Sequence, residues 1–126
     1  MPSILKITPI LDVGSIEAEM PFWVDRLGFE CVAQVPDGDT IGFAILKKDG
    51  SELMLQSTRS LKADLGTAPG GSALVYVCVP DLDEAEQAVG GAEIVVPRRK
   101  TFYGAHEIWV RSPGGHVVGL SQYEGE

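Results

Sequence analysis

The chain has 126 residues, of which 44% are hydrophobic and 22% charged, and its formal net charge is −8. This length and balance predict one globular domain, residues 1–126, with a hydrophobic core of its own. The acidic charge argues against a nucleic-acid partner, which needs clustered Lys and Arg, and the lack of a long apolar run argues against a membrane partner. We expect a cytoplasmic protein, because the N-terminus carries no export signal.

The first half predicts a strand, a helix and three further strands. Residues 4–11 alternate weakly and predict the first strand. Ser15 is a helix N-cap, and an apolar stripe follows it as far as Gly28, with Pro21 distorting the first turns without breaking the helix. The next three strands are predicted at residues 29–35, 41–46 and 52–56, separated by turns that contain Gly38 and Gly50.

The second half follows the same plan. Residues 60–71 predict a linker, because they end in Ala68-Pro69-Gly70-Gly71, and they divide module one (1–59) from module two (72–126). Asp81 is expected to cap a short helix that stops at Gly90-Gly91. Strands are predicted at residues 74–79, 92–96, 108–111 and 116–122. An internal repeat of this kind fixes the fold class, α+β with two tandem βαβββ modules.

Three motifs carry a resemblance to a known family. They are Phe22-Trp23-x-x-x-Leu27-Gly28-Phe29, Val79-Pro80-Asp81-Leu82 and Ser112-Pro113-Gly114-Gly115-His116. Together with the repeat, they resemble the vicinal oxygen chelate superfamily, which includes glyoxalase I, extradiol dioxygenases, fosfomycin-resistance enzymes and bleomycin-resistance proteins. The first motif looks most like the bleomycin-binding branch. The resemblance covers nearly the whole chain. It implies mixed sheets that form a shared concave cavity, helices on the outer faces, and a homodimer.

The repeat also locates the metal ligands of the metal-dependent relatives. By the resemblance, one pair lies five residues before Val13 and Val79, and the other lies four residues after Gly50 and Gly115. The positions so identified are Thr8, Leu74, Met54 and Gly119. None is a His or a carboxylate, and a shift of one residue brings no better donors. We therefore expect no metal and no other cofactor.

Strand alternation predicts what lines the cavity instead. The expected ligand-binding residues are Phe43, Ile45, Glu52, Met54, Gln56, Leu74, Tyr76, Glu107, Trp109 and Ser121. This lining is apolar and aromatic with a few polar groups, which suits a flat or amphipathic small molecule. Trp109 and Tyr76 can stack on an aromatic ring or cover a cation.

Simpler interpretations stand beside these. Trp109 and Phe43 can fill a closed core, and Glu52 and Glu107 can be rim residues in water. Cys31 and Cys78 are typical of buried core residues, and a zinc site built on His106 and His116 matches no known ligand pattern.

Three functions remain. The first is a metal-free binding protein that sequesters an aromatic or cationic compound such as an antibiotic. The second is a lyase, isomerase or dioxygenase-type enzyme that uses the same cavity, for which the sequence assigns no catalytic residue. The third is an accessory module for a protein partner.

Overall fold

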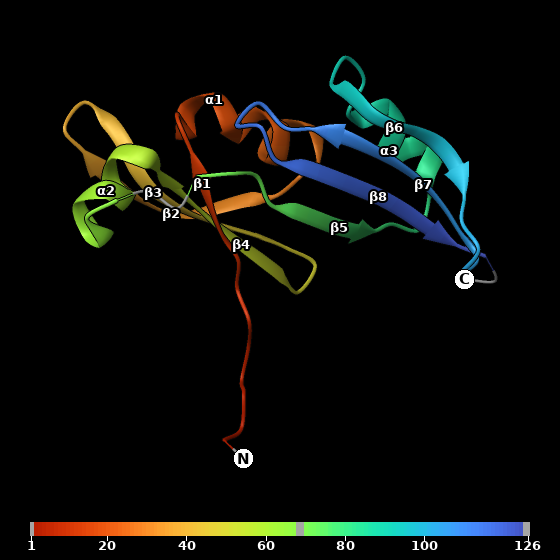
Figure 1. Ribbon diagram of the computed structural model, residues 1–126, viewed down its shortest axis with the longest axis horizontal. Helices are drawn as coiled ribbons and strands as arrows, with labels where there is room; N and C mark the ends of the chain where they lie inside the picture. The colour runs from red at the N-terminus through yellow and green to blue at the C-terminus, as the bar shows by residue number, and fades with distance from the viewer. Residues whose placement is uncertain (1, 68–69, 125–126) are drawn as a thin grey trace.

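The structure is a computed structural model that describes residues 2–67 and 70–124 (Figure 1). In chain order, the elements are β1 (Ile10–Val13), α1 (Ile16–Met20), η1 (Pro21–Arg26), β2 (Glu30–Asp37), β3 (Thr40–Lys48), β4 (Ser51–Ser57), α2 (Thr58–Leu65), β5 (Leu74–Cys78), α3 (Leu82–Ala88), β6 (Glu93–Lys100), β7 (Ala105–Arg111) and β8 (Val117–Tyr123). None of the helices within the described ranges is long and apolar enough to cross a membrane.

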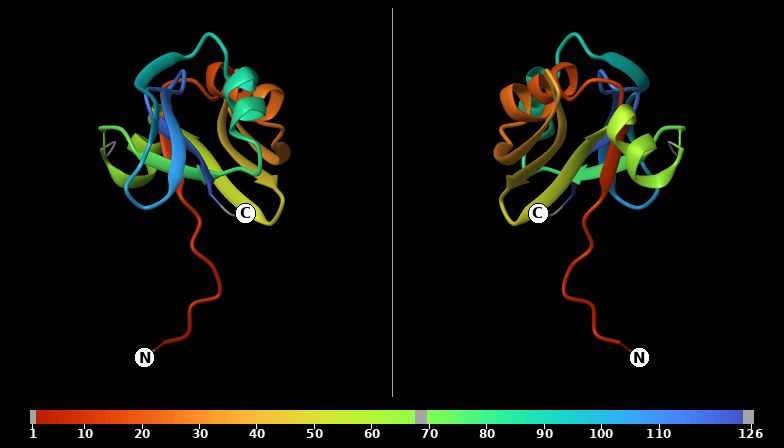
Figure 2. Two further views of the ribbon diagram at one scale, coloured as in Figure 1. Left: turned by 90° about the vertical axis from the view of Figure 1, so that its right-hand side faces the viewer. Right: turned by 90° about the vertical axis from the view of Figure 1, so that its left-hand side faces the viewer.

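The strands form two mixed sheets with the same topology. Sheet A has the order β1-β4-β3-β2, and sheet B has the order β5-β8-β7-β6. In each sheet the first strand of the module pairs in parallel with the last, and the other pairings are antiparallel. The two sheets lie side by side along the long axis of the molecule (Figures 1 and 2). The predicted fold class, α+β with two tandem βαβββ modules, is confirmed.

Each module begins its helix with a side-chain cap. The Ser15 hydroxyl accepts a hydrogen bond from the Ala18 amide at 3.1 Å, and the Asp81 carboxylate accepts one from the Glu84 amide at 3.2 Å. Pro21 has no amide hydrogen to donate to the preceding turn, and from this residue on the first helix widens into the π-helical segment η1. As predicted, the proline distorts the helix without ending it.

One continuous core lies between the helices and the sheets. It is built from strand residues that alternate with outward-facing ones, and from the apolar stripes of the helices. Its largest fully buried apolar side chains include Trp23, Ile16, Leu46, Leu55, Leu82 and Leu120, which come from both modules. Each buried aliphatic side chain stabilises the fold by about 1.5–3 kcal/mol. The two modules therefore share one hydrophobic core, to which both contribute buried side chains.

A buried carboxylate of module one holds the last turn of module two. Glu19 is fully buried and accepts hydrogen bonds from the Trp23 indole at 2.9 Å and from the Gly114 amide at 2.5 Å. A Cβ on Gly114 would lie 2.8 Å from Glu19 Oε1 and 2.9 Å from Val13 Cγ1. Glycine is needed here because module one approaches the turn this closely.

His116 joins the modules at a second point. Its Nδ1 accepts a hydrogen bond from the Ala73 amide at 2.9 Å, so its Nε2 carries the proton and donates to the Asp12 carbonyl at 2.7 Å. Because both ring nitrogens of this buried histidine are used inside the protein, it is not a free metal ligand or base. The motif 112–116 thus fastens one module to the other.

The first strand is shorter than the sequence predicts. It was expected over residues 4–11, but β1 begins at Ile10, and residues 2–9 extend away from both sheets (Figure 1). The Pro9 carbonyl still accepts from the Met54 amide at 2.9 Å. Pro9 has no amide hydrogen for the ladder, which explains why strand pairing stops at this residue.

The predicted linker contains a helix. α2 occupies Thr58–Leu65, and the Ser57 hydroxyl caps it by accepting from the Ser60 amide at 3.1 Å. α2 has a single buried apolar residue, Leu61, so the sequence shows no apolar stripe from which to predict it. No helix takes the corresponding place after β8 in the described chain.

Candidate functional site

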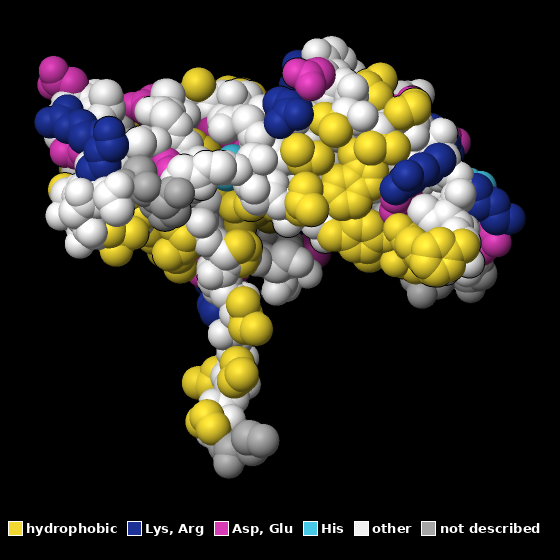
Figure 3. Space-filling model, viewed as in Figure 1, with side chains coloured by type: hydrophobic (Ala, Val, Ile, Leu, Met, Phe, Trp, Pro, Cys, Tyr) yellow, Lys and Arg dark blue, Asp and Glu magenta, His cyan; other side chains and the backbone are white. Residues whose placement is uncertain are grey.

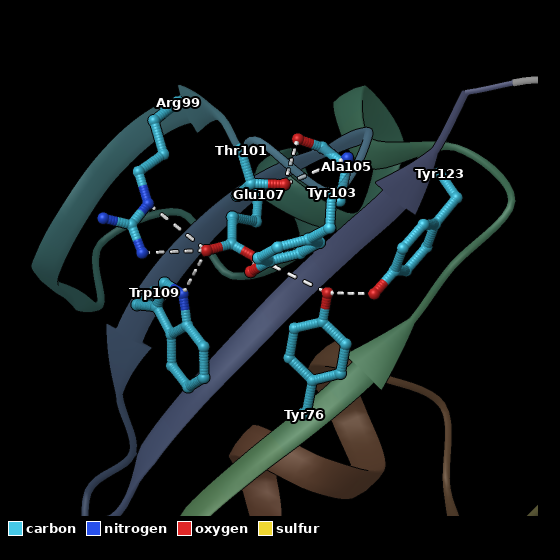
Figure 4. A network of polar contacts seen from close by, with 8 residues as sticks. All are labelled: Tyr76, Arg99, Thr101, Tyr103, Ala105, Glu107, Trp109 and Tyr123. Atoms are coloured by element: carbon cyan, nitrogen blue, oxygen red, sulfur yellow. Dashed lines mark hydrogen bonds and ion pairs between the residues drawn. The ribbon is translucent and has the colours of Figure 1, made fainter.

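The inner faces of the sheets, opposite α1 and α3, carry the predicted ligand-binding residues. In β7, Ile108 and Val110 point into the core, so Glu107 and Trp109 point to the inner face of sheet B. Tyr76 from β5 and Tyr123 from β8 lie on the same face, and Arg99 reaches it from β6 (Figure 4).

Trp109 lies against the backbone of the neighbouring strand. In the pairing of β7 with β8, it is opposite Gly119, which has no side chain. A Cβ on Gly119 would lie 2.6 Å from Cε2 of the indole. On the other side of Gly119, the Tyr76 ring has its centroid 5.9 Å from that of Trp109, tilted by 34°. The two rings form an aromatic surface of which Tyr76 leaves 42% of its area exposed.

Glu107 lies beneath this aromatic surface and accepts hydrogen bonds from it. It is fully buried, and its Oε1 accepts hydrogen bonds from the Trp109 indole at 3.0 Å and from Arg99 Nη2 and Nε at 3.0 and 3.2 Å. Its Oε2 accepts from the Tyr103 hydroxyl at 2.9 Å and from the more distant Tyr76 hydroxyl at 3.5 Å. One carboxylate thus fixes the orientation of two aromatic rings and a guanidinium group (Figure 4).

The same contacts shift the pKa values of the network. Burial raises the pKa of Glu107, but hydrogen bonds from Trp109, Tyr103 and Arg99 outweigh it, and the net pKa is lowered. The hydrogen bond to Glu107 raises the pKa of Tyr103. The hydrogen bond to Tyr76, followed by burial, raises the pKa of Tyr123 to about 12. At neutral pH, the network therefore holds an ionised Glu107 together with the neutral phenols of Tyr103 and Tyr123.

The inner face of sheet A is mainly apolar and partly covered. Phe43, Ile45 and Met54 lie on it as neighbours, and α2 covers the end that carries Gln56. The Gln56 amide nitrogen donates to Ser60 Oγ at 3.0 Å and to Asp64 Oδ2 at 2.8 Å, both on α2.

Glu52 lies at the other end of the sheet A face and pairs with Lys6 of the N-terminal segment. This hydrogen bond lowers the pKa of Glu52, although burial opposes it.

The ten predicted ligand-binding residues therefore fall into two groups of five. Phe43, Ile45, Glu52, Met54 and Gln56 belong to sheet A, and Leu74, Tyr76, Glu107, Trp109 and Ser121 belong to sheet B. Among the described residues, the hydrogen bonds and ring contacts of each group stay on its own side. Glu107 is not a rim residue in water, because it is fully buried beneath the rings.

The prediction missed three residues of the network, Arg99, Tyr103 and Tyr123. Tyr123 continues the inward alternation of β8 beyond Ser121 and could have been included on that signal. Arg99 belongs to the basic run Arg98-Arg99-Lys100, but β6 has irregular pairing between Val96 and Arg99, so alternation does not say which side chain faces inward.

The donor set does not fit the metal of the metal-dependent relatives. Thr8 lies outside β1, while Met54 and Leu74 offer no nitrogen or oxygen side-chain ligand. The fourth position, Gly119, has no side chain and is covered by the Trp109 ring. Across residues 2–67 and 70–124, no group of three or more His, Cys, Asp or Glu side chains is placed to hold a metal ion. His106 instead contacts Glu124, at 3.1 Å.

A separate pocket of about 450 Å³ lies where the modules meet, between sheet A, α2 and residues 70–73. Of the ten predicted residues, Gln56 alone lines it. Its carboxylates, Asp12 and Asp64, accept hydrogen bonds from Thr58 and Gln56. The two carboxylates of this pocket thus help to hold α2 on the sheet.

Comparison with known proteins relates the chain to others through structure alone. No protein-family model matches the sequence, and no curated protein sequence matches it either. A glyoxalase/bleomycin resistance protein/dioxygenase from Nocardioides superposes with a TM-score of 0.74 and 20% identity, covering 100% of this chain and 89% of that one.

Two further solved structures with this fold carry different functional descriptions. A lactoylglutathione lyase from Agrobacterium tumefaciens has a TM-score of 0.77 and 16% identity, covering 97% of this chain and 96% of that chain. TnmS3, an antibiotic binding protein from Streptomyces sp. CB03234, has a TM-score of 0.70 and 18% identity, covering 98% of this chain and 100% of that chain. The chain thus has the fold of the glyoxalase/bleomycin-resistance/dioxygenase superfamily, as the motifs predicted. At these identities the likeness establishes the fold, and the activity has to be argued from the site.

Proposed function

We propose that this protein binds a planar aromatic small molecule on the inner face of sheet B and sequesters it without a metal ion. The observation that carries the proposal is the Trp109 ring, which lies flat over Gly119 and is held in place by Glu107. A ring fixed in this way loses little conformational entropy when a ligand stacks on it.

The surroundings of Trp109 support this assignment. Module two carries several exposed apolar side chains, among them Leu74, Tyr76, Phe102 and Tyr103, and the Tyr76 ring contacts Trp109 directly. Figure 3 shows a broad apolar patch on this side of the molecule. Large apolar patches on soluble proteins commonly mark binding surfaces. In this proposal, sheet B supplies the contacts to the ligand, and the five predicted residues of sheet A bound the cavity without stacking on it, either within one chain or across a homodimer.

The sequestration hypothesis draws on the branch that the first motif resembles. TnmS3 is described as an antibiotic binding protein and shares the fold. We propose that the compound bound here is likewise an aromatic antibiotic or a compound of similar shape. Titration calorimetry against bleomycin-type and other polycyclic aromatic compounds tests this, and absence of binding at micromolar protein concentration would exclude the compounds tried.

A matched pair of variants tests the location of the site. Trp109→Leu removes the stacking ring from sheet B, and Phe43→Leu removes a half-buried ring from sheet A. We expect Trp109→Leu to abolish binding of a planar aromatic compound and Phe43→Leu to leave it nearly unchanged. Equal losses in both variants would show that the two faces form one site. Unchanged binding in Trp109→Leu would refute the site on sheet B.

The enzymatic alternative depends first on metal content. The four positions discussed above hold no suitable donors, so we expect protein purified without chelator to carry no stoichiometric zinc, nickel, iron or manganese. Elemental analysis measures this. A stoichiometric metal that chelators remove together with an activity would favour the lyase, isomerase or dioxygenase alternative.

A further inference from the structure

The polar groups that a ligand on sheet B can reach are not the ones that the sequence suggests. Glu107 is fully buried, and both of its oxygens are occupied by donors of the protein. Its negative charge is therefore unavailable for direct contact with a ligand. Its ion-pair partner, Arg99, has a side chain that is 55% exposed. The accessible member of this pair is the cation.

Arg99 also has hydrogen-bonding capacity left over. A guanidinium group carries five N–H donors. Arg99 uses Nε and Nη2 toward Glu107, and Nη1 has no partner among the described residues. Figure 4 shows this nitrogen pointing away from the network. The donors of Arg99 and of the Trp109 indole converge on one oxygen, so the guanidinium group lies beside the Trp109 ring, with Nη1 on its outer side.

The other charges near this face are already paired. Arg111 contacts Glu93 at 3.2 Å, and Lys100 contacts Glu124 at 3.0 Å. The phenols of Tyr103 and Tyr123 are neutral near pH 7, because their pKa values are raised. What the aromatic surface offers a ligand is therefore a stacking ring and a cationic donor, side by side.

We infer that the ligand of this face is an aromatic acid, whose ring stacks on Trp109 and Tyr76 while its carboxylate accepts hydrogen bonds from Arg99. This inference rests on the proposed function and replaces the cationic ligand with an anionic one. The net charge of −8 favours cations at long range, but salt screens such fields beyond about 8–10 Å. In this arrangement Arg99 contacts the carboxylate of the ligand directly, so its charge is not screened in this way. Arginine is suited to planar carboxylates because its donors form a matching fork.

Three probes with the same ring separate charge from stacking. They carry a carboxylate, a hydroxymethyl group or an aminomethyl group on naphthalene. The indole N–H signals in NMR spectra provide the readout, because one tryptophan, Trp109, lies at the site and the other, Trp23, is buried in the core. We expect the carboxylate probe to bind about tenfold more tightly than the alcohol, which corresponds to one charge-assisted hydrogen bond at an exposed site. The aminomethyl probe should bind most weakly, and the Trp23 signal should not move.

Two neighbouring arginines provide the matched variants. Arg99→Gln should lower the affinity of the carboxylate probe to that of the alcohol, with the alcohol unchanged, and Arg99→Lys should restore part of the preference. Arg98→Gln is the control, because Arg98 pairs with Asp83 and Glu86 on the opposite side of the sheet.

The outcomes separate the inference from the proposed function. Equal affinities, a tighter ammonium probe, or a carboxylate preference that survives in Arg99→Gln would overturn the inference and leave the binding site intact. Failure of all three probes to shift the Trp109 signal would instead count against the proposed function.

Discussion

The two modules share their topology and their helix-side core, but they differ on their inner faces. Sheet A presents Phe43 and aliphatic side chains and is partly covered by α2, whereas in the described part of the chain no helix covers the inner face of sheet B, which presents several rings held by a buried carboxylate. The helix side is constrained because both modules contribute to one core. The inner face is free to diverge because each sheet builds it alone. In a repeat protein of this kind, function is best sought where the copies differ.

Equivalent positions show how this divergence keeps packing intact. In sheet A, Ile45 is paired with Met54, and at the matching place in sheet B, Trp109 is paired with Gly119. Where sheet A has two side chains of medium size, sheet B has one large side chain opposite a glycine. The total volume on the sheet is similar, but sheet B gains a flat ring in place of two flexible chains.

The largest expected effect comes from removing the buried carboxylate of sheet B. Glu107→Ala leaves the Trp109 indole and the Tyr103 hydroxyl without their acceptor, so we expect the free energy of unfolding to fall by about 2–3 kcal/mol. Urea denaturation measures this change. The control is Glu52→Ala, which removes a carboxylate from sheet A and should barely move the midpoint, since its partner Lys6 is largely exposed.

The contribution of Glu107 to stability should also depend on pH. The pKa of Glu107 is lowered in the folded state relative to the ordinary value of 4.5. Its contribution is therefore fully present above that value and is lost as the pH falls through the folded pKa. Glu107→Gln should make unfolding less dependent on pH below 4.5. If the stability of Glu107→Gln depends on pH below 4.5 as strongly as that of the unsubstituted protein, the ionised state assigned to Glu107 is wrong.

Gly119→Ala tests the space beneath Trp109. The added methyl group would meet the ring at 2.6 Å, so we expect a loss of about 1–3 kcal/mol and a displaced Trp109 indole signal. Met54→Leu, the matched change in sheet A, conserves volume and should cost less than about 1.5 kcal/mol. Trp109→Val should relieve the Gly119→Ala defect. If it does not, the steric explanation is wrong.

A smaller effect is expected for α2, which has no counterpart after β8 in the part of the chain that the structure describes. Ser57→Ala removes the cap of α2 and should lower the free energy of unfolding by about 1 kcal/mol. Hydrogen exchange should increase at the Ser60 amide, while the amides of β7 and β8 stay unchanged. An equal increase in sheet B would show that α2 supports both modules.

The last prediction concerns the titration of the tyrosines at high pH. All three tyrosines of the sequence, Tyr76, Tyr103 and Tyr123, lie in module two, so tyrosinate absorbance reports on sheet B alone. The pKa of Tyr123 is about 12 in the folded protein against an ordinary 10.0, so the stability it confers is present below pH 10 and lost as the pH rises toward 12. Tyr123→Phe should remove the highest-pH step of the titration, and Phe43→Leu should not affect it.

Much of the fold was predictable because its signals are local. Ser15 and Asp81 mark helix starts and Gly28 marks a helix end, which was enough to reveal the repeat. α2 was not predictable, because its stability depends on contacts with β4 that become visible only once sheet A is formed.

The site was predictable in part. Alternation correctly places Tyr76, Glu107 and Trp109 on one face, and pairing the last two strands of module two is enough to bring Trp109 onto Gly119. Alternation does not reveal that Arg99 reaches Glu107, because the irregular pairing of β6 changes which side chains point inward. The sequence favoured a cation because of its aromatic lining and its net charge of −8, and alternation gave no sign of the arginine beside the rings.

The contact between Trp109 and Gly119 also limits how this lineage can change. A carboxylate at position 119, the place of a metal ligand in the enzymes that the sequence resembles, would collide with the indole. Replacing Trp109 with a smaller residue first would leave a cavity and would remove one of the hydrogen-bond donors to Glu107. Either single substitution is expected to weaken the protein before the second can help. A metal ligand at position 119 would therefore require both substitutions, and each of them alone is expected to destabilise the protein.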